Sequence, residues 1–293
     1  MDQHHLYKVV EIQGKDQGCI ALEDIRKGTL ILEEKPQIVA KNLGENPDGS
    51  DNLELLSIIE GFGHMNKIEI AEYLKLHNNF TDSDKVPDQW KLDYATIKQT
   101  LIEKNPSAFD LSRFGFVKEF ILKQGDQGFI DVIGIYLTNT FSHGLGIQAS
   151  KFNHSCCPNA NSYWNEKNDI REIRAVSKIK KGEEIHISYI GAEGMMNLIA
   201  RQMRFSSSYG FKCNCELCQS EVLTNNNERY EKFEMLKQEA KLFIQKYEQP
   251  SLTYQQKKDF TINEISCYRK MYKLVLFDPV SYTHLTLPTI LLV

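Results

Sequence analysis

The residue types best suited to chemistry gather in two short segments of the second half of the chain. The first segment runs Asn153-His154-Ser155-Cys156-Cys157-Pro158-Asn159 and holds amides, an imidazole, a hydroxyl and thiols. No apolar face can be drawn through it, so it is neither a plain amphipathic helix nor a plain strand. Taken alone it also fits a polar turn, because Asn, Ser and Pro favour turns.

The second segment is a cluster of thiols, with Cys213, Cys215 and Cys218 in C-x-C-x2-C spacing. Structural Zn²⁺ takes four tetrahedral Cys or His ligands. The cluster is therefore one ligand short, and the fourth must come from elsewhere in the chain. The remaining cysteines are Cys19, Cys156, Cys157 and Cys267. Three unrelated thiols are the competing interpretation.

Composition and charge narrow the class of protein. Of the 293 residues 41% are hydrophobic, which is ordinary for a globular protein. The net charge of -4 argues against a chain built mainly to neutralise nucleic-acid phosphates. Residues 1–8 contain no apolar signal-peptide core, and no apolar run approaches the ~20 residues of a membrane helix. Because seven cysteines then point to a reducing compartment, we expect a protein of the nucleus or cytoplasm, or both.

The elements that must position these residues are short strands and helices. β-branched and apolar runs bounded by glycine predict small antiparallel sheets. We expect the strands within residues 6–40, 161–164, 170–176 and 184–189. Apolar residues at helical spacing predict the helices. We expect these within residues 53–106, 107–140, 193–206 and 220–279, with stops at Gly61 and at Asn105-Pro106.

In this order and spacing, four motifs together resemble the SET-domain protein lysine methyltransferases, and most closely the SET-and-MYND family. The motifs are Gly144-x-Gly146-Ile147, Asn153-His154-Ser155-Cys156-x-Pro158-Asn159, Gly182-Glu183-Glu184-Ile185-x-Ile187-Ser188-Tyr189 and Tyr209-x-Phe211-x-Cys213-x-Cys215-x2-Cys218. The resemblance is good over residues 6–40 and 107–219 and weak over 41–106.

The resemblance implies an α+β fold in which small curved sheets form a pseudo-knot, with a C-terminal segment threaded under a loop. That threading would bring the Asn-His motif and Tyr189 side by side. The expected organisation is an N-terminal part of the SET domain at 1–40, a loop and helical insertion at 41–106, the core SET domain at 107–206, a post-SET zinc segment at 207–219 and the start of a helical C-terminal region at 220–279.

The resemblance also implies ligands. The cofactor is S-adenosylmethionine, and Phe211 is expected to stack on its adenine. The full set of implied cofactor contacts is Lys15, Asp16, Gln17, His77, Asn139, Asn153, His154, Tyr189 and Phe211. Phe141 and Tyr209 would line the substrate channel beside the catalytic Tyr189. The family pattern makes Cys156 the fourth ligand of one structural Zn²⁺, together with Cys213, Cys215 and Cys218.

The chain departs from the family pattern in two places. The loop Gly14-Lys15-Asp16-Gln17-Gly18 has Asp16 where a central glycine is usual. The MYND finger needs a cluster of Cys and His, yet no cysteine occurs between Cys19 and Cys156. We therefore expect that finger, and the partner binding that depends on it, to be absent.

The chemistry sets its own requirements. Methyl transfer from a sulfonium to an amine is an in-line displacement, and it needs a neutral lysine, whose free pKa is about 10.4. A desolvated channel and a nearby sulfonium charge both lower that pKa. The phenol of Tyr189, with an ordinary pKa near ~10, is a poor general base at neutral pH. Its better role is to hold the amine in line with the methyl group by hydrogen bonding.

These observations predict a protein-lysine N-methyltransferase, acting on histone or other lysines as a monomer, with no direct binding to nucleic acid or membrane. A catalytically inactive SET module that binds a peptide is the alternative. Residues 280–293 contain no Lys, Arg, Asp or Glu and break abruptly with the charged helical pattern before them. We expect this tail to be an artefact of sequence processing rather than native chain.

Overall fold

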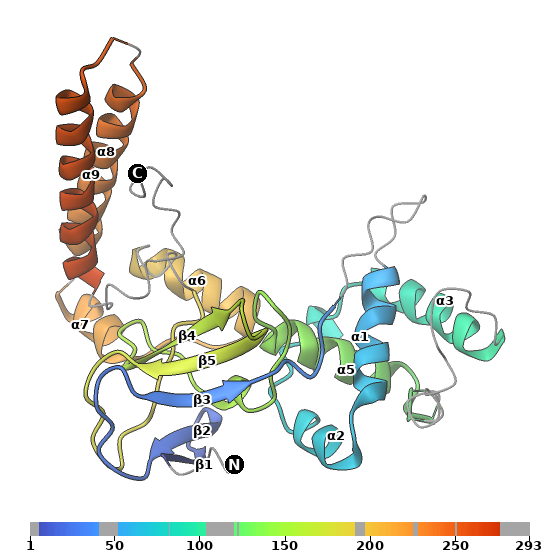
Figure 1. Ribbon diagram of the computed structural model, residues 1–293. Helices are drawn as coiled ribbons and strands as arrows, with labels where there is room; N and C mark the ends of the chain where they lie inside the picture. The colour runs from blue at the N-terminus through green and yellow to red at the C-terminus, as the bar shows by residue number, and fades with distance from the viewer. Residues whose placement is uncertain are drawn as a thin grey trace.

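The computed structural model describes residues 6–40, 52–81, 83–103, 120–121, 123–190, 197–224, 228–249 and 251–275. All but the last residue of the predicted loop from 41 to 52, most of the stretch from 107 to 125 and the suspect tail 280–293 lie outside these residues. Two small sheets occupy the centre, a group of helices lies on one side, and a long helical hairpin projects from the other (Figure 1). The expected α+β class is confirmed.

The first sheet is an antiparallel hairpin of β1 (Tyr7–Ile12) and β2 (Asp16–Ala21), in which Tyr7 pairs with Ala21 and Ile12 with Asp16. The connecting turn contains Gly14, whose φ of 77° lies in the left-handed region that glycine adopts without steric cost. The hairpin therefore ends in a tight polar turn that projects beyond the sheet.

The second sheet is antiparallel, with strand order β3-β5-β4. Its strands are β3 (Leu30–Glu34), β4 (Ala160–Asn165) and β5 (Ile170–Ala175). The strands expected in residues 6–40, 161–164 and 170–176 are thus confirmed. Apolar side chains from both sheets, including Tyr7, Ile31 and Ile173, form one buried core together with Phe152.

The prediction of a regular strand at residues 184–189 is wrong. This segment pairs only through isolated bridges, antiparallel between Glu184 and Ile20 and parallel between Ile187 and His154. The physical reason is that its two ends face different partners, so no continuous ladder can form. The parallel bridge nevertheless places residues 187–189 directly beside the Asn-His motif.

The helical insertion packs around its own apolar core. Its elements are α1 (Asn52–His64), α2 (Lys67–Tyr73), a short 3₁₀ turn η1 (Ser83–Lys85), α3 (Gln89–Glu103) and α5 (Asp126–Asn139). Helix α1 continues past the predicted stop at Gly61. A Cβ at Gly61 would lie 2.8 Å from the Ile38 side chain, so the glycine allows the helix to pack closely there. The Tyr73 hydroxyl donates to the Val132 carbonyl at 2.6 Å and joins α2 to α5.

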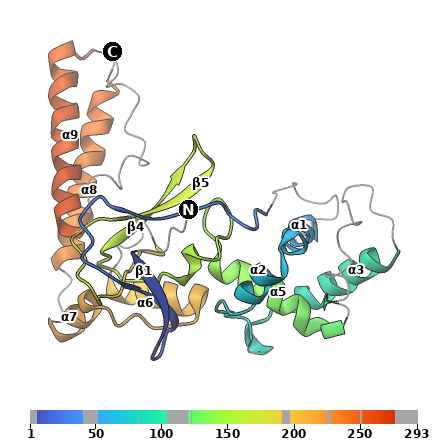
Figure 2. The ribbon, with the colours of Figure 1, turned by 60° about the horizontal axis from the view of Figure 1, so that its bottom comes forward.

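The C-terminal helices are α6 (Leu198–Tyr209), α7 (Glu216–Thr224), α8 (Glu228–Tyr247) and α9 (Tyr254–Val275). Helices α8 and α9 form an antiparallel pair around Leu236, Ala240 and Met271 (Figures 1 and 2). Helix α6 begins at an Asn197 cap and ends at Gly210, whose φ is 73°. Among the described helices none is both long and apolar enough to cross a membrane.

An ion pair between a buried lysine and a partly exposed glutamate joins the helical insertion to the sheet region. Lys151 ends the short 3₁₀ turn η3 (Ala149–Lys151), and its Nζ lies 2.5 Å from Glu72 of α2. The Lys151 side chain is only 4% exposed, whereas the partly exposed Glu72 also pairs with Lys75. Hydrogen bonds from Lys151 and Lys75 lower the pKa of Glu72 to about 2.

We predict that Glu72→Gln lowers the free energy of unfolding by about 3 kcal/mol at pH 7, because it leaves the buried Lys151 ammonium without a counter-charge. The depressed pKa of Glu72 means that its contribution is complete above pH ~4.3 and is lost as pH falls toward 2. In denaturant unfolding, the difference in the free energy of unfolding between the wild type and Glu72→Gln should therefore become smaller from pH 7 to pH 3. Lys75→Gln, which removes only the exposed partner, should cost less than ~1 kcal/mol. Equal effects of the two variants would contradict this assignment.

Candidate active site

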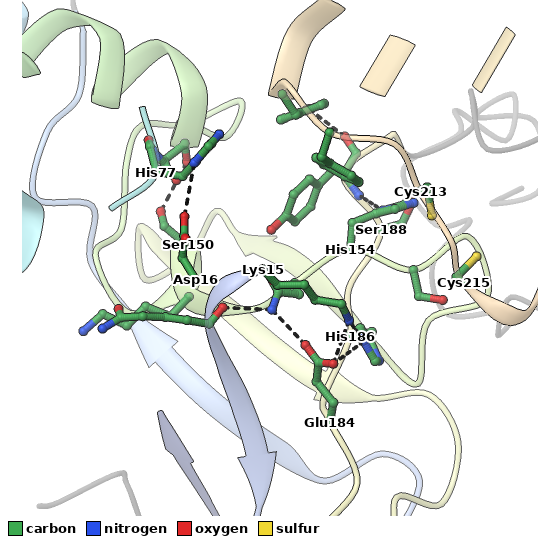
Figure 3. A pocket seen from close by; sticks show the side chains of 18 of the residues that line it. Lys15, Asp16, His77, Ser150, His154, Glu184, His186, Ser188, Cys213 and Cys215 are labelled. Atoms are coloured by element: carbon green, nitrogen blue, oxygen red, sulfur yellow. Dashed lines mark hydrogen bonds and ion pairs between the residues drawn. The ribbon is translucent and has the colours of Figure 1, made fainter. Parts of the chain in front are cut away.

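A single cavity of about 1310 Å³ lies between the β1–β2 turn, the C-terminal end of α5, the Asn-His motif and the segment joining α6 to α7. Its lining residues come from six separate stretches of the sequence, within 13–17, 75–77, 138–142, 150–159, 183–189 and 209–216, and Figure 3 shows part of this lining. All of the predicted cofactor and channel residues line it, namely Lys15, Asp16, Gln17, His77, Asn139, Phe141, Asn153, His154, Tyr189, Tyr209 and Phe211. The structure thus brings this set together, while the role of each residue stays a prediction.

Asp16 occupies the loop position where the family pattern has glycine. Its φ of 57° is left-handed, a conformation that Asp tolerates better than most residues. Its carboxylate lies 3.4 Å from Nδ1 of His77, which approaches from the helical insertion. The loop therefore keeps a glycine-like conformation and gains a contact across the mouth of the cavity.

Asn139 joins the end of α5 to the same segment. Its side-chain amide donates to the carbonyl of His77 and to that of Ile135, each at 2.7 Å. The family resemblance is weak around His77 and good around Asn139. The structure places these two residues in direct contact. One wall of the cavity is consequently held by hydrogen bonds between α5 and the residues that follow α2.

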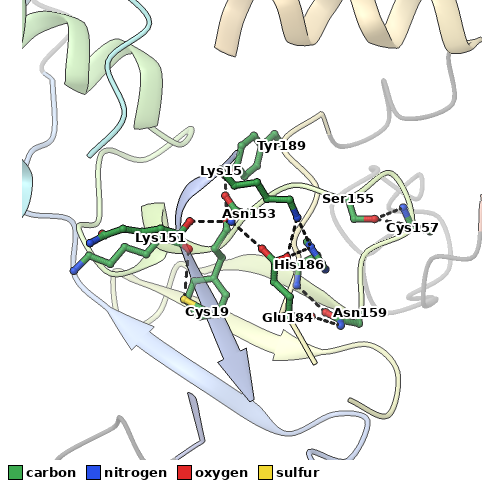
Figure 4. A network of polar contacts seen from close by, with 12 residues as sticks. Lys15, Cys19, Lys151, Asn153, Ser155, Cys157, Asn159, Glu184, His186 and Tyr189 are labelled. Atoms are coloured by element: carbon green, nitrogen blue, oxygen red, sulfur yellow. Dashed lines mark hydrogen bonds and ion pairs between the residues drawn. The ribbon is translucent and has the colours of Figure 1, made fainter. Parts of the chain in front are cut away.

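Glu184 organises the opposite wall, and sequence reasoning missed it. The Asn153 amide donates to Glu184 Oε1 and to the Gln17 carbonyl, both at 2.8 Å. Lys15 Nζ donates to Glu184 Oε2 at 2.8 Å, and His186 Nε2 lies 3.0 Å from the same oxygen (Figure 4). Burial would raise the pKa of Glu184, but hydrogen bonds from His186, Lys15 and Asn153 outweigh it and lower the pKa to about 2. Glu184 is therefore ionised at neutral pH and fixes the orientation of Asn153.

Gly18 makes this network possible. A Cβ at this position would lie 2.7 Å from the Asn153 amide nitrogen and 2.9 Å from Glu184 Oε1. Any larger residue would push the two side chains away from β2. The signal for Glu184 was present in the sequence, since it belongs to the Gly182-Glu183-Glu184 motif, but its partners are remote in the chain.

Aromatic residues form the inner part of the cavity. The Tyr189 hydroxyl donates to the Phe152 carbonyl at 2.8 Å, and the Tyr209 hydroxyl donates to the Tyr189 carbonyl at 3.2 Å. Phe141 lies on another side, with the guanidinium of Arg171 centred 4.0 Å from its ring. Burial raises the pKa of Tyr189 well above its ordinary value, so its phenol stays protonated at neutral pH.

Phe211 contributes an aromatic surface at the far end of the cavity. Its ring stacks on Phe205 of α6 with centroids 5.2 Å apart and an interplanar angle of 19°. Both rings belong to a small apolar cluster that also contains Cys156, Cys213 and Cys218. The expected stacking surface is thus supported from behind by α6 and by the thiol cluster.

The thiol cluster has the ligand set that a structural metal requires. The sulfurs of Cys156, Cys213, Cys215 and Cys218 all lie within 4.8 Å of one another. Cys156 Sγ is 3.6 Å from Cys218 Sγ and 4.0 Å from Cys213 Sγ. Four converging, largely buried thiols fit tetrahedral Zn²⁺. Neither Cys157 nor Cys19 belongs to the group, and Cys19 instead contacts the Lys151 carbonyl.

We predict one tightly bound Zn²⁺ per chain, measured by elemental analysis of the purified protein. Cys156→Ser should lose most of this zinc and unfold at lower temperature, because it removes one of four ligands. Cys157→Ser is the matched control, since the neighbouring thiol lies outside the cluster, and it should retain the metal. Zinc loss in the Cys157 variant with retention in the Cys156 variant would overturn the ligand set.

Comparison with protein families matches residues 16–190 to the SET domain. A putative SET domain-containing protein of Acanthamoeba polyphaga mimivirus is 29% identical over 71% of this chain and 76% of its own. A SET and MYND domain-containing protein of Dictyostelium discoideum is 25% identical over 59% of this chain and 52% of its own. The mouse protein-lysine N-methyltransferase SMYD4 is 39% identical over 27% of this chain. The chain spans only 10% of that mouse protein.

Solved structures show a more distant similarity. Rubisco LSMT bound to AdoMet has 17% sequence identity and a TM-score of 0.41, covering 71% of this chain and 52% of its own. The SET domain match, by contrast, covers more than half of the sequence and contains the Asn-His motif and Tyr189. The chain therefore belongs to the SET domain family.

Proposed function

We propose that the chain is an S-adenosylmethionine-dependent protein-lysine N-methyltransferase. The observation that carries this proposal is the single cavity that joins the polar contacts around Asn153 to the aromatic group of Phe141, Tyr189 and Tyr209. Several relatives are named lysine methyltransferases, including the histone-lysine N-methyltransferase SET5 of Saccharomyces cerevisiae, which is 30% identical over 49% of this chain. Those names support the reaction class.

The donors and surfaces of the cavity fit S-adenosylmethionine. Lys15, Gln17 and Asn153 line the cavity with polar groups suited to an amino acid group, and Phe211 lines it with a ring suited to adenine. The volume of about 1310 Å³ leaves room for a lysine side chain as well. When bound, the cofactor would supply an electrophilic methyl group.

The aromatic residues would prepare the lysine. A channel walled by Phe141, Tyr189 and Tyr209 excludes water and so favours the neutral amine over the ammonium ion. The Tyr189 hydroxyl already donates to the Phe152 carbonyl, which leaves its oxygen lone pairs to accept an N–H from the amine. Because the Tyr189 pKa is raised, this residue orients the amine and does not remove a proton.

The proposed partner is a protein or peptide lysine, of a histone or another protein, and a monomer in the nucleus or cytoplasm suffices for this chemistry. The proposed zinc has no part in the transfer. Its role is to fold the segment that carries Tyr209 and Phe211 over the cavity, because Cys213 and Cys215 follow these residues closely.

The alternative is a catalytically inactive peptide-binding module, and the replacement of the usual loop glycine by Asp16 is one argument for it. That argument is weakened because Asp16 adopts the left-handed conformation that the loop needs. Incubating the zinc-loaded chain with S-adenosylmethionine and panels of histones and cell-lysate proteins, followed by mass spectrometry, tests the proposal. We expect methylated lysines, whereas cofactor binding without any methylated product would favour the inactive module.

We predict that Tyr189→Phe reduces kcat by on the order of 10²-fold or more while the cofactor Kd changes little. The substitution removes the hydroxyl that orients the amine, and alignment errors of about 1 Å cost roughly that much. Turnover and calorimetric binding should be measured on the same preparation. Tyr247→Phe on the remote helix α8 is the matched control and should leave both quantities unchanged. Wild-type turnover in the Tyr189 variant would remove its catalytic role.

We also predict that the left-handed backbone at Asp16 controls cofactor affinity. Asp16→Gly should keep the cofactor Kd within a few-fold, because glycine adopts this conformation freely. Asp16→Val should weaken binding by roughly ten-fold, because a left-handed L-residue costs about 1–2 kcal/mol and β-branching worsens the clash. Calorimetric titration with S-adenosylmethionine compares the two. Equal affinities would show that the loop conformation does not matter.

A further inference from the structure

His154 is buried, at 7% exposed, yet both of its ring nitrogens have specific neighbours. The backbone N–H of Tyr189 donates to His154 Nδ1 at 3.1 Å. On the other side of the ring, His154 Nε2 lies 3.3 Å from Cys156 Sγ. The imidazole therefore lies between the backbone of Tyr189 and one of the four clustered thiols.

These two contacts define the tautomer. A backbone N–H can only donate, so Nδ1 must present a lone pair to Tyr189. A ring with a lone pair on Nδ1 is the neutral imidazole, because the imidazolium ion carries a proton on both nitrogens. The single ring proton then resides on Nε2 and points at the Cys156 sulfur.

The state of Cys156 decides how good an acceptor that sulfur is. A metal-bound thiolate carries negative charge and accepts a hydrogen bond strongly, whereas a free thiol is a weak acceptor with a proton of its own. A zinc-bound Cys156 thus favours the Nε2–H tautomer, and that tautomer is the one that accepts from Tyr189. The ring orientation is further restricted by Phe205, whose centroid lies 4.4 Å from that of His154.

We propose that His154 is a positioning residue that links the four-cysteine cluster to Tyr189, so that metal binding at the cluster fixes the backbone that carries the catalytic hydroxyl. This inference rests on the proposed zinc ligation and on the proposed function. It assigns His154 a role beyond contact with the cofactor, and it gives a reason for the position of the four-cysteine cluster beside the proposed methyl-transfer site.

Selective ¹⁵N labelling of histidine gives a readout that does not depend on activity. In the zinc-loaded full chain, NMR should show His154 with Nε2 protonated and Nδ1 unprotonated. Removing zinc with a chelator should convert this pattern to a mixture of tautomers. A protonated Nδ1 in the zinc-loaded chain, or an Nε2–H pattern unchanged in a folded zinc-free chain, would overturn the proposal.

Because chelation can unfold the chain, variants provide a second test in the zinc-loaded protein. His154→Asn places an acceptor near the Nδ1 position but cannot reach Cys156, and His154→Gln places a donor near the Nε2 position. We expect both variants to keep about one zinc per chain and to lower kcat by at least ~10-fold with a smaller change in the cofactor Kd.

His64→Gln on the exposed part of α1 is the matched control and should behave as wild type. Wild-type kcat in His154→Asn would show that the link to Cys156 is unnecessary and would overturn the proposal. If the wild-type chain transfers no methyl group, the proposed function fails, while the tautomer measurement still decides the link to the metal cluster.

Discussion

The structure depends on the parallel pairing of two chain segments that are distant in the sequence. Residues 153–155 run parallel to residues 187–189, with Ile187 N–H donating to the Asn153 carbonyl and Ser155 N–H donating to the Ile187 carbonyl, each at 3.0 Å. Neither segment is long enough to form a regular strand, so this pairing is stabilised by the core of both sheets beneath it. Through it, Asn153 and Tyr189 share one cavity, although they are far apart in the sequence.

Three side-chain contacts of different kinds stabilise this pairing. Glu184 binds Asn153 on the side of the β1–β2 turn. Lys151, buried just before the motif, pairs with Glu72 and connects the motif to the helical insertion. His154 extends toward Cys156 and thereby to the thiol cluster. The site is consequently built from ionic, hydrogen-bonding and proposed metal contacts around two short segments.

Much of this architecture could be predicted because its signals are local. Short apolar runs between turns predict strands β1 to β5. The three thiols after Phe211 predict a metal-binding thiol cluster. The segment 184–189 was predicted as a strand, but its ends pair with different partners, which a pattern of residue types does not reveal. Helix α1 continues through Gly61 because that glycine packs against Ile38.

Glu184 was missed because its partners, Lys15 and Asn153, come from remote positions. Cys156 as fourth ligand came from family resemblance, since the residues alone left four thiols open.

We propose that the parallel pairing of residues 153–155 with residues 187–189 builds the cofactor site. Calorimetric titration of the zinc-loaded full chain with S-adenosylmethionine tests it most directly, with Asn153→Ala as the comparison. We expect saturable binding of one cofactor per chain in the wild type and a loss of at least ~10-fold in affinity in the variant, because Asn153 and its Glu184 network form one wall of the cavity. A folded, zinc-loaded wild-type chain that does not bind the cofactor would contradict it.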